Sequence, residues 1–226
     1  MIEVCGTADE AVAGIPDAAT VLIGGFGVAG MPFDLIDALI RQGATDLTVV
    51  SNNAGNGDAG LAALLAAGRV RKVICSFPRQ ADSHVFDALY RAGRIELELV
   101  PQGNLAERMR AAGAGIGAFF CPTGVGTPLA EGKETRVIDG RTYVLEYPIH
   151  GDVALIKAET ADRMGNLIYR KTSRNFGPVM AMAAAMTIAQ VRRVVEPGGI
   201  DPEVVVTPGI FVDRIVEIAE PMDGVA

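Results

Sequence analysis

Three amide side chains stand where polar groups could act on a ligand. Asn52 and Asn53 follow one apolar run, and Gln102 follows another. Amides neither take up nor release protons near neutral pH, but they donate hydrogen bonds to a carboxylate or to a developing oxyanion. A single Asn would most simply cap a loop. Two adjacent Asn residues together with Gln102 favour a site that holds a carboxylate or an oxyanion.

A glycine-rich loop offers a second kind of chemistry. The stretch IGGFGVAGMP, residues 23–32, contains G-x-G-x-x-G between an apolar run and an amphipathic one, the setting of a dinucleotide-binding turn. Such a site usually needs an acid about 20 residues further on, after the second strand. Ser51-Asn52-Asn53 stands there instead. We therefore disfavour NAD, and expect either a tight packing turn or a loop whose backbone N–H groups face another ligand.

The usual catalytic signatures are absent from the sequence. It has no G-x-S-x-G elbow, and its two histidines, His84 and His150, have no spacing to carboxylates or cysteines that suggests a metal site. The three cysteines lack CxxC spacing and are expected to be buried thiols in a reducing compartment. The chain thus offers oxyanion-type donors without a nucleophile, and another chain could complete such a site.

The elements that must position these groups alternate along the first half of the chain. Apolar strand patterns alternate with helical ones, which predicts right-handed βαβ units and a mostly parallel sheet. Ligands of such sheets bind beyond the carboxyl ends of the strands, so the loops after neighbouring strands share one rim. The expected strands span residues 19–25, 46–53, 71–76, 94–102 and 116–121, and the expected helices 32–40, 59–68, 82–93 and 104–113.

The second half of the chain has a different pattern. The run TRVIDGRTYVLEY predicts a β-hairpin that turns at Asp139-Gly140, and residues 152–158 predict a further strand. A Met- and Ala-rich helix is expected at 178–190 and a last helix near 211–219. We predict a single α/β domain over 1–226, with an open, mostly parallel sheet flanked by helices and a small antiparallel annex.

Composition limits the function classes. The chain has 226 residues, is half apolar and carries a net charge of −7, which argues against nucleic acid as a partner. No apolar stretch reaches the length of a membrane span. The N-terminus has no basic region followed by a long apolar core, so we expect no signal peptide. We expect a cytoplasmic protein.

Several long motifs together resemble one family. GGFGVAGMP, SNNAGNG, VPQGNLAERMRAAGAGIGAFFCPTGVGT, EGKETRVIDGRTYVLE and YRKTSRNFGPVMAMAA are similar to the A (alpha) subunit of the family I 3-oxoacid CoA-transferases. The resemblance runs from about Thr20 to Val216 and implies the CoA-transferase fold. It also implies an A2B2 assembly with a homologous B (beta) subunit, whose catalytic glutamate stands in a Ser-Glu-Asn-Gly motif. This chain lacks that motif.

The resemblance gives roles to the residues above. Asn52, Asn53 and Gln102 match the polar residues that support the partner's glutamate. The resemblance implies a ping-pong reaction with CoA thioesters as substrates and a glutamyl-CoA intermediate. We expect no metal and no permanently bound cofactor. The loop assigned to CoA consists of Gly24, Gly25, Phe26, Gly27, Val28, Ala29 and Gly30.

Within the family, residues 51–109 are most similar to members that move CoA from succinyl-CoA to 3-oxoadipate in aromatic-acid degradation. Both acids carry a second carboxylate, for which Arg79 is a candidate partner. Arg170, Lys171 and Arg174 form a second basic group that could meet CoA phosphates, although a solvated face is the simpler interpretation. The alternatives are acetoacetate or acetate as acceptor, or a non-catalytic ligand-binding domain.

Overall fold

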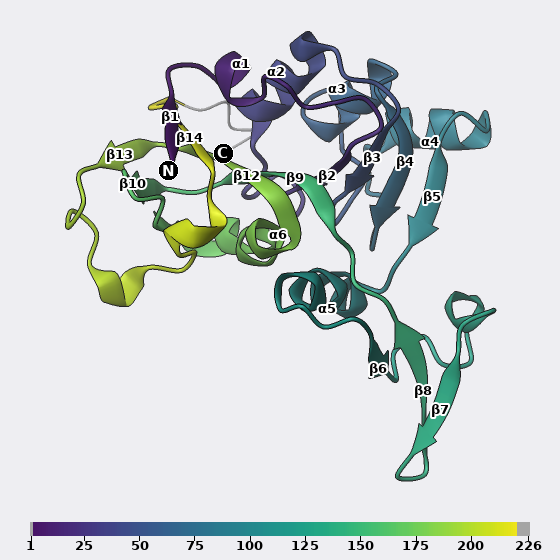
Figure 1. Cartoon of the computed structure of the whole chain (residues 1–226). Coiled ribbons are helices and arrows are strands. Elements are labelled where there is room, and N and C mark those ends of the chain that lie inside the picture. Colours follow the sequence, from purple (N-terminus) through teal and green to yellow (C-terminus); the bar gives the residue numbers. More distant parts are fainter. Residues whose placement is uncertain (1, 221–226) are drawn as a thin grey trace.

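An eight-stranded sheet in which every strand pair is parallel forms the centre of the molecule (Figure 1). The structure is a computed structural model, and it describes residues 2–220. The single domain was predicted over 1–226, and of this range residue 1 and residues 221–226 lie outside the described part. In sheet order, the strands are β1 (Glu3–Cys5), β14 (Arg214–Glu217), β12 (Ala184–Val191), β9 (Gly151–Lys157), β2 (Thr20–Ile23), β3 (Leu47–Val50), β4 (Val70–Cys75) and β5 (Glu96–Leu99).

Helices cover both faces of this sheet, as Figure 1 shows. Alternate strand residues feed two separate cores: Val21 and Ile23 pack on one face, whereas Leu22 packs on the other. This is why the strands are apolar throughout and not at every second position. One face carries α1 (Ala8–Ala11), α2 (Phe33–Gln42), α3 (Leu61–Ala66) and α4 (His84–Arg91), and the other carries α5 (Gln102–Gly113) and α6 (Gly177–Ala183).

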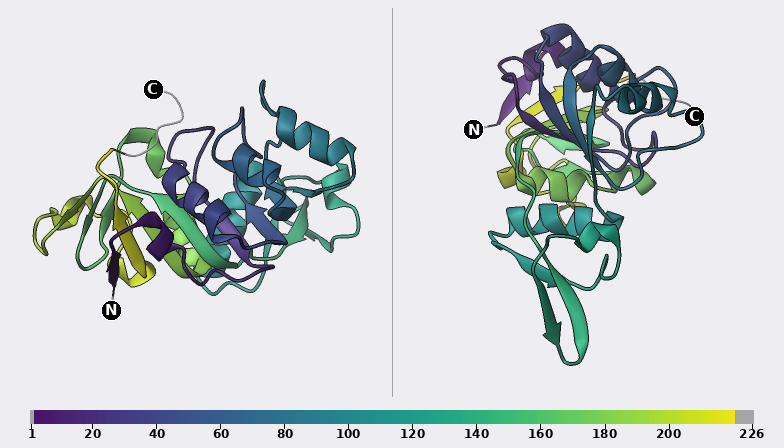
Figure 2. Two further views of the ribbon diagram at one scale, coloured as in Figure 1. Left: turned by 90° about the horizontal axis from the view of Figure 1, so that it is seen from above. Right: turned by 90° about the vertical axis from the view of Figure 1, so that its right-hand side faces the viewer.

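Two smaller sheets are attached to this framework. An antiparallel one projects from the body as an arm (Figures 1 and 2), and its hairpin turns at Asp139 and Gly140, whose φ angles of 48° and 75° suit a type I′ turn. The predicted hairpin is confirmed. The arm contains β6 (Phe119–Cys121), β7 (Thr135–Ile138) and β8 (Arg141–Glu146), and the other sheet contains β10 (Thr160–Asp162), β11 (Leu167–Ile168) and β13 (Arg193–Val195). Short 3₁₀ turns span Pro128–Ala130, Lys171–Arg174, Pro202–Val204 and Gly209–Phe211.

The predicted fold class is confirmed, but two predicted helices are wrong. Residues 178–190 hold only the short helix α6 followed by the strand β12, and the region near 211–219 holds the strand β14. β12 lies between β9 and β14 in the middle of the sheet, buried from Thr187 to Val191. A strand buried on both faces shows no alternation, so periodicity alone does not distinguish it from a buried helix.

Two other expectations also fail. The predicted strand at 116–121 is β6, which pairs antiparallel with β8 in the arm and not with the central sheet. The loop after it therefore does not follow a strand of the central sheet. The helix predicted at 104–113 begins two residues earlier, at Gln102, and Asn104 lies within it; the Asn104 Nδ2 donates to Glu146 Oε1 at 3.1 Å. Among residues 2–220, none of the helices has the length and apolar character needed to cross a membrane.

Candidate active site

Asn52 is the centre of the polar cluster at the carboxyl edge of the sheet. It follows β3 and is 3% exposed. Its Oδ1 accepts hydrogen bonds from Ser76 Oγ at 2.7 Å and from Gln102 Nε2 at 3.2 Å. Ser76 follows β4 and Gln102 opens α5 after β5, and β3, β4 and β5 are neighbours in the sheet. The shared rim expected for Asn52 and Gln102 is therefore present.

These two bonds fix the orientation of the Asn52 amide. Both donors are directed at its oxygen, and within the described residues its Nδ2 has no hydrogen-bond acceptor. The backbone strengthens this arrangement, since the N–H groups of Ser76 and Phe77 both donate to the Asn52 carbonyl. The Asn52 Nδ2 is thus available as a donor to a bound molecule. Ser76 was not among the predicted site residues.

A hollow of about 340 Å³ lies in front of this amide. Its lining combines amides and a hydroxyl with two aromatic rings that are about half exposed, Phe26 (51%) and Phe77 (58%). In the described part of the chain, no carboxylate lines it. Such a hollow can donate hydrogen bonds to an anion, but it offers no carboxylate or thiol nucleophile, and its Ser76 hydroxyl is bonded to Asn52. The lining residues are Phe26, Asn52, Ser76, Phe77, Gln80 and Gln102.

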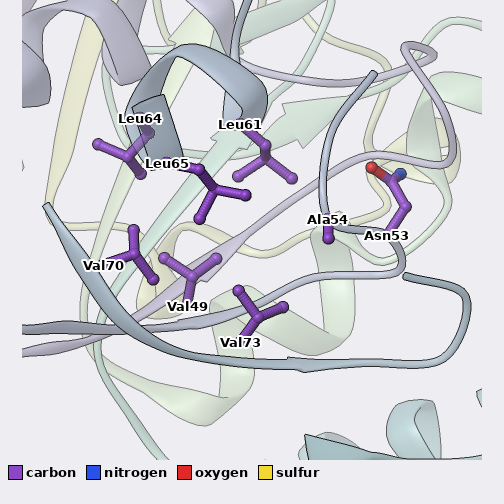
Figure 3. A pocket seen from close by; sticks show the side chains of 8 residues that line it. All are labelled: Val49, Asn53, Ala54, Leu61, Leu64, Leu65, Val70 and Val73. Atoms are coloured by element: carbon purple, nitrogen blue, oxygen red, sulfur yellow. The ribbon is translucent and has the colours of Figure 1, made fainter. Parts of the chain in front are cut away.

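Asn53 points elsewhere. Its Oδ1 accepts from the Gly55 N–H at 2.8 Å, and its Nδ2 donates to the Gly27 carbonyl at 3.5 Å. Figure 3 shows Asn53 at the edge of an apolar group under α3, formed by Val49, Ala54, Leu61, Leu64, Leu65, Val70 and Val73. That space holds no water-sized volume and is a packing gap. The contacts of Asn53 are those of a loop cap that ties the 53–55 turn to the glycine loop.

The glycine loop is packed against a segment far away in the sequence. Gly30 has a φ of +76°, and a β-carbon there would lie 2.4 Å from the Ser173 carbonyl oxygen. Asn175 joins the two segments: its Oδ1 accepts from the Gly25 N–H at 3.1 Å, and its Nδ2 donates to the Ala29 carbonyl at 2.9 Å. The absence of a side chain at Gly30 therefore allows its backbone to approach that of Ser173 closely. Asn175 was missed, although it lies in the YRKTSRNF motif.

Arg79 is not part of the hollow. Its Nε pairs with Asp87 Oδ1 at 2.5 Å, and its side chain is 55% exposed. The neighbouring Gln80 lines the hollow instead. Any contact between Arg79 and a bound dicarboxylate requires that the arginine leave Asp87.

Two acids beside the arm, the buried Glu146 and the half-buried Glu98, are engaged in structural pairs. Lys133 and Asn104 both donate to Glu146, which is 3% exposed. Burial alone would raise the pKa of Glu98, but hydrogen bonds from Lys72 at 2.6 Å and Arg108 at 3.0 Å outweigh it and lower that pKa. These charges hold the arm, α5 and β5 together.

Comparison with known proteins agrees with this geometry. A family model described as Coenzyme A transferase matches residues 6–218. The chain therefore belongs to the coenzyme A transferase family. It is 70% identical over 210 residues to the A subunit of the 3-oxoadipate CoA-transferase of Pseudomonas putida, covering 93% of this chain and 91% of that one. The predicted family resemblance is confirmed.

Two further relatives are informative. The A subunit of a probable succinyl-CoA:3-ketoacid coenzyme A transferase of Bacillus subtilis (strain 168) is 51% identical, with coverage of 96% and 90%. A solved acyl-CoA transferase from E. coli O157:H7, in a thioester complex with CoA, superposes with a TM-score of 0.85 at 25% identity. The superposition covers 98% of this chain and 50% of that one, so this chain spans about half the length of that transferase.

Proposed function

We propose that this chain is the A subunit of an enzyme that moves CoA from succinyl-CoA to 3-oxoadipate, acting with a B subunit that carries a catalytic glutamate. The observation that carries the proposal is the hollow at Asn52, which has oxyanion donors and no carboxylate, in a chain 70% identical to the A subunit of a 3-oxoadipate CoA-transferase. The half-length match to the solved transferase supports a second chain.

The proposed reaction is a covalent ping-pong sequence. The partner's glutamate attacks the succinyl-CoA thioester carbon, which releases CoA thiolate and forms a mixed anhydride. The thiolate attacks the glutamyl carbon of the anhydride, which releases succinate and leaves a glutamyl-CoA thioester. The 3-oxoadipate carboxylate then displaces the thiolate to form a second anhydride. Attack of the thiolate on the 3-oxoadipyl carbon gives 3-oxoadipyl-CoA and restores the glutamate.

This chain would supply hydrogen-bond donors to that sequence. The Asn52 Nδ2, held in place by Ser76 and Gln102, would donate to the glutamate carboxylate and to the oxyanions that form as its carbonyl is attacked. Asn53 would act indirectly, by holding the loop between residues 53 and 55 against the glycine loop. The glycine loop would form a wall of the CoA site.

The 3-oxoacid acceptor is the finer part of the proposal. Identity of 70% to the 3-oxoadipate enzyme against 51% to the 3-ketoacid enzyme favours the dicarboxylic acceptor. Acetoacetate or acetate is the alternative. We further propose an A2B2 assembly in the cytoplasm and a role in aromatic-acid degradation, as the family resemblance implies.

The test is to co-express the chain with a candidate B subunit that carries Ser-Glu-Asn-Gly. The purified complex would be assayed with succinyl-CoA and, in parallel, with 3-oxoadipate, acetoacetate and acetate. We expect the highest kcat/KM with 3-oxoadipate and no transfer by either chain alone. Transfer only to acetoacetate would reassign the acceptor. Absence of transfer to every acid would overturn the proposal.

A further inference from the structure

Two amide nitrogens in the hollow at Asn52 have no hydrogen-bond acceptor. Of the three amides that line it, Gln102 donates its Nε2 to Asn52 Oδ1 at 3.2 Å. The Asn52 Nδ2 and the Gln80 Nε2 have no acceptor within residues 2–220. Asn52 follows β3 and Gln80 follows β4. A molecule in the hollow therefore meets two free side-chain N–H donors that belong to different loops.

Neighbouring residues set the orientation of the Gln80 amide. The Asn56 Nδ2 donates to Gln80 Oε1, so the oxygen is occupied and the nitrogen is left for a ligand. The backbone is held as well, because the Gln80 N–H donates to Ser83 Oγ at 2.8 Å. Ser83 is 5% exposed, and its hydroxyl donates to the Gly55 carbonyl at 3.0 Å. Gln80 thus repeats the arrangement at Asn52: the amide oxygen is engaged and the nitrogen is free.

The bond between Asn56 and Gln80 lies between two hollows of different charge. Gln80 lines the hollow at Asn52, which has no carboxylate in its lining within the described chain. Asn56 lines a second hollow, of about 380 Å³, together with Asp58 and Asp82. These two acids repel an anion from the second hollow. An anionic group is therefore favoured on the Asn52 side of the boundary, where the Gln80 nitrogen is available to it.

Two separate donors suit a ligand with a carboxylate at each end. In the proposed reaction, one carboxylate of 3-oxoadipate reacts with the partner's glutamyl group beside Asn52. Its second carboxylate lies at the other end of the carbon chain, and acetoacetate has no such group. A hydrogen bond to an ionised acceptor is stronger than one between neutral groups, so a neutral amide can distinguish the two acids. A monocarboxylic acid leaves the Gln80 nitrogen to water.

We infer that Gln80 determines the choice of acceptor by donating a hydrogen bond to the second carboxylate of 3-oxoadipate. The inference rests on the proposed function for the identity of the substrate. Arg79, the residue expected in this role, pairs with Asp87 and does not line the hollow. The next residue along the chain takes the role because its side chain is held at the hollow by Asn56.

The test measures kcat/KM of the complex with the B subunit for 3-oxoadipate and for acetoacetate. In a ping-pong sequence, this quantity reports only the half-reaction of the acceptor, so effects on succinyl-CoA do not enter. Gln80→Glu keeps an oxygen that accepts from Asn56 and replaces the free nitrogen with a charged oxygen. The ratio of the value for 3-oxoadipate to that for acetoacetate should fall about tenfold or more.

Further variants change the charge at the same atom in steps. Gln80→Leu removes the donor without adding a charge, so the ratio should fall less than in Gln80→Glu. Gln80→Lys introduces a cation and should raise the ratio. Arg94→Gln, at an exposed position after α4, changes the net charge by the same amount as Gln80→Glu and should leave the ratio unchanged. Transfer of CoA to either acid shows that a variant is folded.

Two outcomes would overturn the inference. One is an unchanged ratio in Gln80→Glu, which includes an equal loss with both acids, and the other is a ratio that falls in Gln80→Lys. Failure of the proposed function is a different result, because the unmodified complex would then transfer CoA to neither acid. In that case, calorimetry with 3-oxoadipate still decides the question: no binding to the unmodified complex, or equal affinity for Gln80→Glu, would contradict the role of Gln80.

Discussion

At the scale of single residues, the central feature is an amide whose direction is set by two donors. An Asn side chain can rotate to present either its oxygen or its nitrogen to a ligand. In this protein Ser76 and Gln102 both bond to the Asn52 oxygen, and this leaves the nitrogen as the donor. A neutral donor of fixed direction is suited to a carboxylate that alternates between a charged and an acylated form.

Substitutions at these three positions should therefore change kcat more than KM. We expect Asn52→Ala and Gln102→Ala each to lower kcat of the complex by about tenfold or more, as loss of an oxyanion-type contact does. Ser76→Ala should lower it less, by about threefold to tenfold, because Gln102 still holds the amide. Steady-state kinetics with succinyl-CoA and 3-oxoadipate measure this.

A hydroxyl restored at position 76 provides the matched control. Ser76→Thr should recover most of the kcat lost in Ser76→Ala, since its hydroxyl can again donate to Asn52. If kcat is unchanged in Asn52→Ala and Gln102→Ala, these amides are loop caps and nothing more.

Arg79 permits a sharper prediction about substrate choice. If it binds the second carboxylate of 3-oxoadipate, Arg79→Ala should raise KM for 3-oxoadipate far more than for acetoacetate. The ion pair with Asp87 competes with that role. Asp87→Asn, which frees the arginine, should then lower KM for 3-oxoadipate or leave it unchanged. Equal effects of Arg79→Ala on both acceptors would reject a role in specificity.

At the scale of elements, the glycine loop and the 171–175 segment form one unit. Their contact depends on the absence of a side chain at Gly30 and on the bonds of Asn175 to both partners. Gly27, in the same loop, has a φ of +62°, but a β-carbon at that position would meet no atom within 4 Å beyond its chain neighbours. The two glycines thus share a backbone conformation and differ in their surroundings.

This difference predicts unequal costs for the same substitution. Gly27→Ala should lower the free energy of unfolding by about 1–2 kcal/mol, the cost of a left-handed alanine. Gly30→Ala bears that cost and in addition collides with Ser173, which should bring the loss to about 2–5 kcal/mol. Urea unfolding of the two variants measures it. Equal losses of unfolding free energy in the two variants would show that the 171–175 segment can move away from the glycine loop at no cost in stability.

At the scale of the whole molecule, the fold buries groups whose ionisation links stability to pH: Cys75 in the central sheet, and Tyr169 just after β11. Burial raises the pKa of the Cys75 thiol to about 12 from a usual value near 9, and burial likewise raises that of Tyr169 to about 12. Both groups ionise more readily in the unfolded chain. Their contribution to stability is therefore complete below about pH 9 and is lost as the pH rises towards 12.

The free energy of unfolding should accordingly fall as the pH rises from about 9 towards 12, which urea titrations at several pH values would measure. Cys75→Ala removes one titrating group, so its stability should decline less steeply over that range, even if it is lower at neutral pH. The folded protein should also leave Cys75 unreactive towards iodoacetamide at about pH 8, because neutral thiols are poor nucleophiles. A decline of the same slope in both proteins would contradict the assignment.

Much of this molecule could be predicted from local sequence. The alternation of apolar runs and amphipathic helices predicted the parallel sheet from β2 to β5, and Asp139-Gly140 predicted the hairpin, because period and turn chemistry are local properties. The amides after β3 and at the start of α5 were recognised as candidate site residues because parallel strands bring their carboxyl ends to one edge. The absence of a nucleophile motif could also be recognised from the sequence alone.

The tertiary structure decided what depends on contacts between distant segments. Burial on both faces made residues 184–191 a central strand where apolar content had predicted a helix, and the pairing of β6 with β8 moved that strand into the arm. Only the folded chain brings Ser76 to Asn52, separates Asn53 from the hollow, and holds Lys171 and Arg174 beside the glycine loop through Asn175. Hydrogen bonds across 24 to 146 positions of the sequence carry no local signal, so no pattern of spacing could have predicted them.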